Sequence, residues 1–371
     1  MRIFPHRTVL TILITVLATA CGGGSGSSLR AGPRRLMLGD LAAIVIVPTY
    51  ENLAAQAAGL AAATAQLDGT ADATTLAAVQ DAWRRTRGAW KQSEAFGFGP
   101  AETLRTPAKI DWTPVRPDRI EAEIAGDGEL TADYVDDLGA NVKGFLALEY
   151  LLFDPDGGDA AVLDALAANA RRRRFVEALA EDLRDQTVVL RDAWEPMVGN
   201  FSAELADAGA GSTVYPTVKS AVDDVVNQLV FVSETVADEQ LLAALGTRTG
   251  GVPDPQIIAA HRSRNGRADL LDNLTGIEDV YFVTYAGRSG ESLSAIVASL
   301  SPAVDGALSL SMRRSMETAT RIPAPLEQAL TTDAELVERA QARAKELMQR
   351  LQIDLISVLG STLRFSPNDG D

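Results

Sequence analysis

Four residues that could bind a ligand share one predicted helix face. They are Trp83, Arg87, Trp90 and Glu94, which follow one another at intervals of four, three and four residues. This spacing brings side chains onto one side of a helix. An arginine between two indoles can stack on them and bind a carboxylate, so the face could line a pocket. The pattern also fits core packing, in which the indoles fill the core and Arg87 forms an ion pair with one acid. We favour this second interpretation.

Glu149 is a second candidate, because it interrupts the apolar run of residues 145–153. A carboxylate buried in such a run must be ion-paired, hydrogen-bonded or protonated. It could be a ligand or polar anchor at the floor of a cleft, or a structural ion pair with an arginine such as Arg87. The sequence leaves both open. Asp111, directly before Trp112, is expected to cap or brace a turn.

Composition excludes several classes of function. The 371 residues include two His and one Cys, so neither a site of three histidines nor a thiolate zinc cage can form. Lys and Arg number 34 against 50 Asp and Glu, a formal charge of −16. Nucleic acid is therefore not expected as a partner, because phosphate binding needs a basic surface.

The N-terminus is typical of an exported bacterial lipoprotein. Arg2 and Arg7 precede a short apolar run over residues 9–20, as in a signal peptide. Cys21 follows small residues, which predicts cleavage after residue 20 and lipidation of Cys21. Residues 21–36 begin with a Gly/Ser stretch and are expected to form a flexible tether. The predicted location is the periplasmic side of a bacterial membrane, in the outer membrane. A secreted protein with a chance cysteine is the alternative.

Four long amphipathic segments predict an all-α fold. Apolar residues recur at helical spacing over residues 72–96, 175–194, 217–245 and 333–359, and no sustained alternation indicates strands. Long helices with short connections pack as antiparallel bundles. We predict two such bundles packed side by side, over residues 37–156 and 157–371. The division is placed at the turn-forming residues 154–159.

Three stretches together resemble the imelysin family, also classed as M75 peptidase-like. They are the tryptophan segment over residues 82–100 with residues 110–114, the segment 144–153, and the C-terminus over residues 365–371. The segment 273–285 is also similar to the second half of that family. The resemblance covers roughly residues 40–371 and implies two all-helical bundles in a periplasmic or surface lipoprotein.

The family signature G-x-H-x-x-E is incomplete in this chain. Gly144 and Glu149 match it, but the histidine position is Leu146. Leu146 has no lone pair, so it cannot act with Glu149 on a metal ion or a water molecule. His261 lies more than a hundred residues away, in a polar stretch typical of a surface.

The resemblance implies a binding protein associated with metal or iron uptake. Its site would include Trp83, Arg87, Trp90, Glu94, Asp111, Gly144 and Glu149. Glu149, with acids such as Glu94 and Asp111, would offer oxygen ligands suited to a hard cation such as iron(III), Mn²⁺ or Ca²⁺. Iron-acquisition proteins would be its partners. The alternatives are an M75-type metallopeptidase, which the missing histidine disfavours, and an interaction module that has lost the site.

Replacing Cys21 with serine tests the predicted anchor. Since Cys21 precedes the predicted bundles, Cys21→Ser should leave folding unchanged and release the protein from the membrane. Fractionation of cells with detection of the protein in soluble and membrane fractions measures this. A serine variant that stays in the membrane fraction contradicts the lipid anchor.

Overall fold

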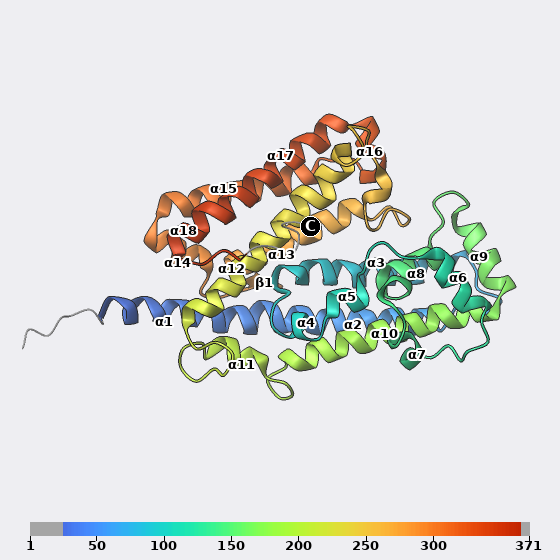
Figure 1. Ribbon diagram of the computed structural model, residues 1–371, viewed down its shortest axis with the longest axis horizontal. Helices are drawn as coiled ribbons and strands as arrows, with labels where there is room; N and C mark the ends of the chain where they lie inside the picture. The colour runs from blue at the N-terminus through green and yellow to red at the C-terminus, as the bar shows by residue number, and fades with distance from the viewer. Residues whose placement is uncertain (1–24, 365–371) are drawn as a thin grey trace, which may run out of the picture.

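Most of the described chain is helical in the computed structural model, which describes residues 25–364, with side chains from residue 31 onward (Figure 1). The predicted signal peptide, Cys21 and the C-terminal residues 365–371 lie outside the described part. The all-α prediction is confirmed. One two-residue hairpin is present within residues 25–364, with Thr284 opposite Ser289 and Tyr285 opposite Arg288.

The elements of the first half are α1 (Ser25–Asp40), η1 (Leu41–Ile46), α2 (Val47–Thr64), α3 (Ala73–Ser93), η2 (Glu94–Phe96), α4 (Pro100–Thr103), α5 (Thr106–Ile110), α6 (Pro117–Ala125), α7 (Ala132–Asp136), η3 (Ala140–Val142), α8 (Gly144–Leu152), α9 (Gly158–Ala168), α10 (Ala170–Trp194) and α11 (Phe201–Ala206). Those of the second half are α12 (Val218–Glu234), η4 (Thr235–Thr247), η5 (Pro255–Ile257), α13 (Gly266–Phe282), β1 (Thr284–Tyr285), β2 (Arg288–Ser289), α14 (Leu293–Leu300), α15 (Pro302–Thr320), α16 (Leu326–Thr332), α17 (Ala334–Arg350), η6 (Leu351–Leu355) and α18 (Ile356–Leu359).

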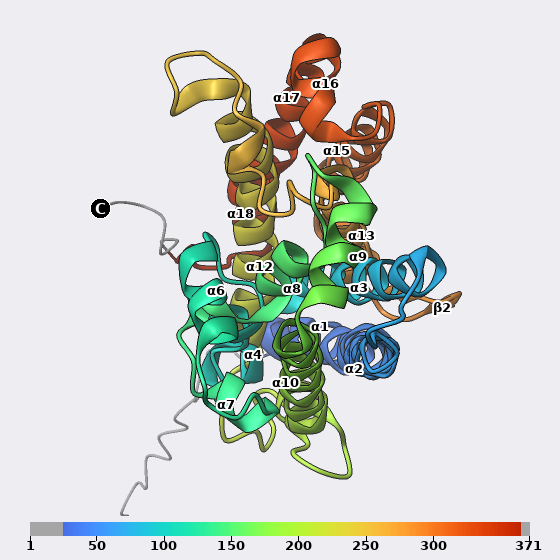
Figure 2. The same cartoon turned by 90° about the vertical axis from the view of Figure 1, so that its right-hand side faces the viewer.

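Helices α2, α3 and α10 form the first packed group, and α8 lies against α3 and α10 (Figures 1 and 2). The sequence fixes where α3 begins, since the Asp72 carboxylate accepts a hydrogen bond from the Thr75 N–H at 2.9 Å. The apolar stripe of α10 ends at Trp194, which is fully buried among aromatic rings including those of Tyr50 and Phe201. Both helices match their predicted spans.

The second group is formed by α12 with η4, α13, α15 and α17 (Figure 1). Thr217 caps α12 through the N–H of Ser220, and the helical path continues to Gly246, whose φ of 101° ends it. The last long helix runs through α17, η6 and α18 to Gly360, which has a φ of 66°. These positive φ values suit glycine and explain why both helices end where the sequence predicted.

Two parts of the predicted domain organisation look different in space. Residues 25–36, assigned to a flexible tether, are helical here, because Met37 and Leu38 are buried and extend the helix of α2 backwards through η1. Helix α10, assigned to the C-terminal bundle, packs along α2 in the first group. The boundary at residues 156 and 157 stays a prediction, but the chain continues to build the first group beyond it.

The helix over residues 31–64 is long and apolar enough to span a membrane, within the described residues. However, 61% of its most apolar window is buried inside the protein. Tyr50, Leu53 and Leu60 are among its fully buried side chains. Burial in the core therefore accounts for this hydrophobicity.

The two groups meet where α13 crosses α3. Gly276 of α13 lies so close to α3 that a Cβ atom there would stand 2.2 Å from the Gln92 carbonyl oxygen. At Gly88, a Cβ atom would stand 2.9 Å from an Asp272 carboxylate oxygen. Small residues at these two positions allow the close approach that brings side chains of both groups into one site.

We predict that Gly276→Ala destabilises the protein, because the added methyl group forces the two helices apart. The expected loss in the free energy of unfolding is about 1–3 kcal/mol or more. Gly306→Ala in α15 is the matched control, since nothing lies within 4 Å of a Cβ atom there. That change should raise stability by about 0.5–1 kcal/mol. Denaturant unfolding measures both, and equal effects at the two glycines would contradict this account of the crossing.

Candidate functional site

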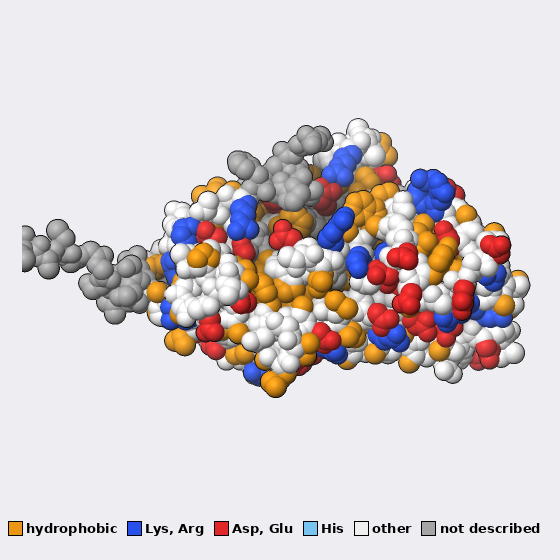
Figure 3. Space-filling view, turned by 60° about the horizontal axis from the view of Figure 1, so that its bottom comes forward, with side chains coloured by type: hydrophobic (Ala, Val, Ile, Leu, Met, Phe, Trp, Pro, Cys, Tyr) orange, Lys and Arg blue, Asp and Glu red, His pale blue; other side chains and the backbone are white. Residues whose placement is uncertain are grey.

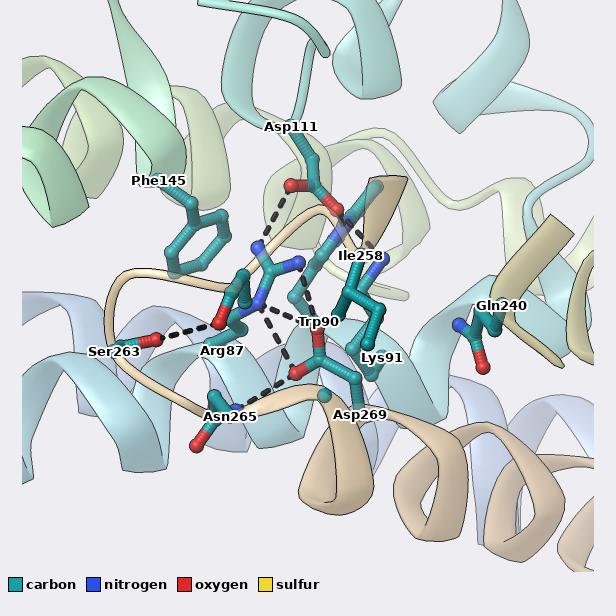
Figure 4. A network of polar contacts seen from close by, with 12 residues as sticks. Arg87, Trp90, Lys91, Asp111, Phe145, Gln240, Ile258, Ser263, Asn265 and Asp269 are labelled. Carbon is teal, nitrogen blue, oxygen red and sulfur yellow. Dashed lines mark hydrogen bonds and ion pairs between the residues drawn. The ribbon is translucent and has the colours of Figure 1, made fainter. Parts of the chain in front are cut away.

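The side chain of Arg87 forms the centre of the site (Figure 4). It is fully buried, and its guanidinium makes ion pairs with two carboxylates. Nη1 lies 2.7 Å from Oδ1 of Asp111, which follows α5, and Nη2 lies 2.8 Å from Oδ2 of Asp269 in α13. The rings of Trp83 and Phe145 flank the guanidinium at 5.6 and 5.7 Å. One cation of α3 is thus bound from both helix groups.

Lys91, one turn further along α3, extends the network. Its ammonium lies 2.7 Å from Oδ2 of Asp111 and 2.9 Å from Oε1 of Glu94. The Trp90 indole also donates to Oδ2 of Asp111, at 3.0 Å. Burial raises the pKa of Asp111, but Arg87 and Lys91 outweigh it and hold that pKa well below the ordinary value. Asp111 is therefore a carboxylate bound to two cations rather than a turn cap alone.

Glu94 forms the edge of the network that is open to solvent, with 22% of its side chain exposed. Its Oε2 accepts a hydrogen bond of 2.6 Å from Nδ2 of Asn273, which also donates to the Lys91 carbonyl oxygen. Gln240 in turn donates to Oδ1 of Asn273 at 2.7 Å. Burial raises the pKa of Glu94, and Lys91 opposes that rise. Side chains of η2, η4 and α13 therefore form this edge of the network.

Glu149 of α8 is only 2% exposed and is bound by Ser263, which precedes α13. Its Oε1 accepts hydrogen bonds from the Ser263 backbone N–H at 2.8 Å and the Ser263 hydroxyl at 2.7 Å. Burial raises its pKa to about 7, although these two bonds act in the opposite direction. Glu149 makes no ion pair among the described residues, so the alternative of a structural ion pair with Arg87 does not apply: Arg87 is paired with Asp111 and Asp269.

Gly144 and Leu146, in the incomplete motif, have structural roles that follow from their size. Gly144 has a φ of 76°, and a Cβ atom there would stand 2.3 Å from the Ile110 carbonyl oxygen. It thus allows α8 to begin directly against the chain that leads to Asp111. Leu146 is 2% exposed and offers no donor or acceptor. Trp83 fixes the same turn, since its indole donates to the Phe145 carbonyl oxygen at 3.0 Å.

The structure brings the predicted residues of α3, Asp111 and α8 around one guanidinium. The sequence did not predict the residues on the opposite side of Arg87, which are Ser263, Asn265 and Asp269. Asn265 donates to Asp269 at 2.7 Å, and Ser263 and Asn265 are buried although their polar stretch resembled a surface. One available signal was the four-residue spacing of Asp269 and Asn273, which places both on one face of α13.

The carboxylates of this site do not fit a resident metal ion. Within the described part of the chain, no group of three or more His, Cys, Asp or Glu side chains is arranged to hold one. Asp111 binds Arg87 and Lys91, Asp269 binds Arg87, and Glu149 is bound by Ser263. A cation entering here would have to displace protein cations that the same acids already neutralise.

Glu149→Gln should change how stability depends on pH. Because the folded-state pKa of Glu149 is raised from 4.5 to about 7, the folded protein holds a proton there that the unfolded chain releases. Stability should therefore fall as pH rises from about 4.5 to 8, by at most roughly 3 kcal/mol from this group. The glutamine variant should lack this component, as measured by urea unfolding at several pH values. Parallel curves for the two proteins would show that Glu149 is charged throughout.

With this geometry established, comparisons with known proteins identify relatives. The chain is similar to "Iron-regulated protein A" of Synechococcus elongatus, with 29% identity over 286 residues, 76% of this chain and 74% of the relative. A crystal structure described as an iron-regulated protein A precursor from Parabacteroides distasonis matches with a TM-score of 0.76 and 20% identity, over 89% of this chain and 95% of the other.

A second solved structure, of an imelysin-like protein from Psychrobacter arcticum, matches with a TM-score of 0.71 and 20% identity, over 90% of this chain and 98% of the other. At this identity the two structures establish the fold. The family model for imelysin, Peptidase_M75, matches residues 46–353 and so spans both helix groups and the whole Arg87 network. The chain therefore belongs to the imelysin family.

Proposed function

We propose that this protein is a lipid-anchored binding protein of the bacterial envelope, which serves iron acquisition and does not hydrolyse peptides. The observation that carries the proposal is the pair Leu146 and Glu149. A hydrolytic metal site needs about three protein ligands and an open position for water. Here the first position of the pair is an apolar side chain, and the second is bound by Ser263 inside the protein.

The remaining polar groups support binding rather than chemistry. Acids and bases around Arg87 are bound to one another in fixed geometry, which supplies a rigid surface but no activated nucleophile. Among the described residues of the network, Glu94 forms the edge near solvent, with 22% of its side chain exposed, so a polar ligand would meet this carboxylate first. The iron connection is supported by the relative described as iron-regulated.

Uptake of radioactive iron by cells tests the role in acquisition. Cells that lack the protein should take up less iron when iron is scarce, and the wild-type chain should restore uptake. Glu149→Gln should restore it as well, because this site needs no metal ligand at residue 149. Equal uptake with and without the protein would contradict the role in iron acquisition.

The purified protein provides the matched test against the peptidase alternative. Wild type should not cleave an unfolded protein substrate, with or without added Zn²⁺, and Leu146→His shows whether completing the motif is sufficient for activity. Chelator-sensitive cleavage by wild type that is lost in Glu149→Gln would establish hydrolysis and overturn the proposal. Calorimetric titration with iron(III), Mn²⁺ and Ca²⁺ should give no heat that depends on Glu149.

A further inference from the structure

The end of the molecule that carries α1 has a distinct exposed surface. We define the anchor-side surface as Arg35, Leu36, Val214, Lys219, Leu363 and Arg364. Its three apolar side chains are 65%, 47% and 43% exposed, in chain order.

Hydrogen bonds bring these three segments together. Arg35 donates from Nε to the Ala208 carbonyl oxygen at 3.3 Å, and Lys219 donates to the Thr362 hydroxyl at 2.9 Å. Arg34 donates to the Leu359 carbonyl oxygen at 2.9 Å, which ties α1 to the segment beyond α18. The surface is therefore a continuous part of the folded body.

In two ion pairs at this end of the molecule, the basic side chain is the more exposed partner. Lys219 is 47% exposed and its partner Asp223 only 12%, while Arg364 is 64% exposed and its partner Asp224 only 15%. In each pair the acid lies inward, so the base faces solvent. Two acids partly offset this positive charge: Asp207 is exposed in the adjoining loop, and the Glu204 carboxylate accepts hydrogen bonds from the backbone N–H groups of Thr213 and Val214.

Two ion pairs at the opposite end, around α6 and α7, have the reverse arrangement, although Arg174 at the same end is 39% exposed against 26% for its partner Glu181. Lys143 is 4% exposed and its partner Asp136 is 43% exposed. Arg172 is 16% exposed and its partner Glu121 is 44% exposed. Figure 3 shows Asp and Glu side chains gathered toward that end, away from α1. The protein is thus polarised, although its formal charge is −16 overall.

The chain that precedes α1 fixes which end can approach a membrane. Only three residues separate Cys21 from Ser25, where α1 begins, and four residue steps span at most roughly 14 Å. Residues 22–39 include Arg30, Arg34 and Arg35 and no acid. With roughly 16 Å of helix between Ser25 and Leu36, an anchor at Cys21 would keep the anchor-side surface within roughly 30 Å of the lipid headgroups.

We infer that the anchor-side surface lies on the anionic phospholipid headgroups of the membrane that holds the protein. Outward cations attract anionic lipid, and exposed Leu36, Val214 and Leu363 can enter the interface between headgroups and acyl chains. The acidic end around α6 and α7 then points away from the bilayer. This inference rests on the proposed lipid anchor only for bringing the surface to the membrane.

Vesicle binding by the unlipidated chain of residues 22–371, which keeps every described residue, tests the surface separately from the anchor. The chain should sediment with vesicles of phosphatidylethanolamine and phosphatidylglycerol at low salt, and less at high salt. It should not sediment with vesicles of phosphatidylcholine. Arg35→Gln with Leu36→Ser should weaken binding at least about fivefold, the factor expected for losing one arginine at the surface.

Arg248→Gln with Val252→Ser is the matched control, because these residues are 58% and 65% exposed beside the elements at the α16 end. This control variant should bind vesicles like wild type. Arg364→Gln should also weaken vesicle binding, and it leaves the sequence of α1 unchanged. Thermal unfolding confirms that each variant is folded. Equal binding to both kinds of vesicle, or the same loss in the control, overturns the inference. Since no lipid is attached, this result is independent of Cys21→Ser and of iron uptake.

Discussion

A guanidinium with no access to water must be neutralised inside the protein, and the site is organised around that requirement at Arg87. Removing such a charge from water costs several kcal/mol, which only well-placed opposite charges can offset. Asp111 and Asp269 provide them from different helix groups, so neither group alone satisfies Arg87. Arg87 is therefore fully paired only when α3 packs correctly against α13. A buried ion pair of this kind favours one arrangement of the two groups over others, whatever its net effect on stability.

This arrangement changes what the incomplete motif means. Leu146 replaces a residue that could have acted on a metal ion, and Glu149 is bound by Ser263 from the segment that leads into α13. The carboxylate thereby holds that segment in place beside Arg87. Residues whose types and spacing suggested catalysis are here buried and bound to one another, and among the described residues of the network Glu94 is the most exposed. The proposed binding role follows because Leu146 and Glu149, which stand at the motif positions, are not in an environment that supports hydrolysis.

The sequence predicted the helices well because their signals are local. The Asp72 cap, the apolar stripe of α10 and the terminal glycines Gly246 and Gly360 each act within a few residues. It also indicated which residues of α3 and α8 face the site. The partners of Arg87 could not be predicted, because Asp269 is 182 residues away and pairing depends on how α13 crosses α3. The segment before α13 was misjudged for a related reason: Ser263 and Asn265 are polar, but burial depends on what packs over them.

The continuous helix from Ser25 through α1, η1 and α2 to Thr64 has a mechanical consequence. At about 1.5 Å per residue it is roughly 60 Å long, and it enters the core at Met37. A continuous helix of this length resists bending. The orientation of its first turns therefore determines the orientation of the helices that pack on it. The Glu94 edge therefore keeps a fixed position relative to this helix, and a molecule that binds there would meet it in one orientation.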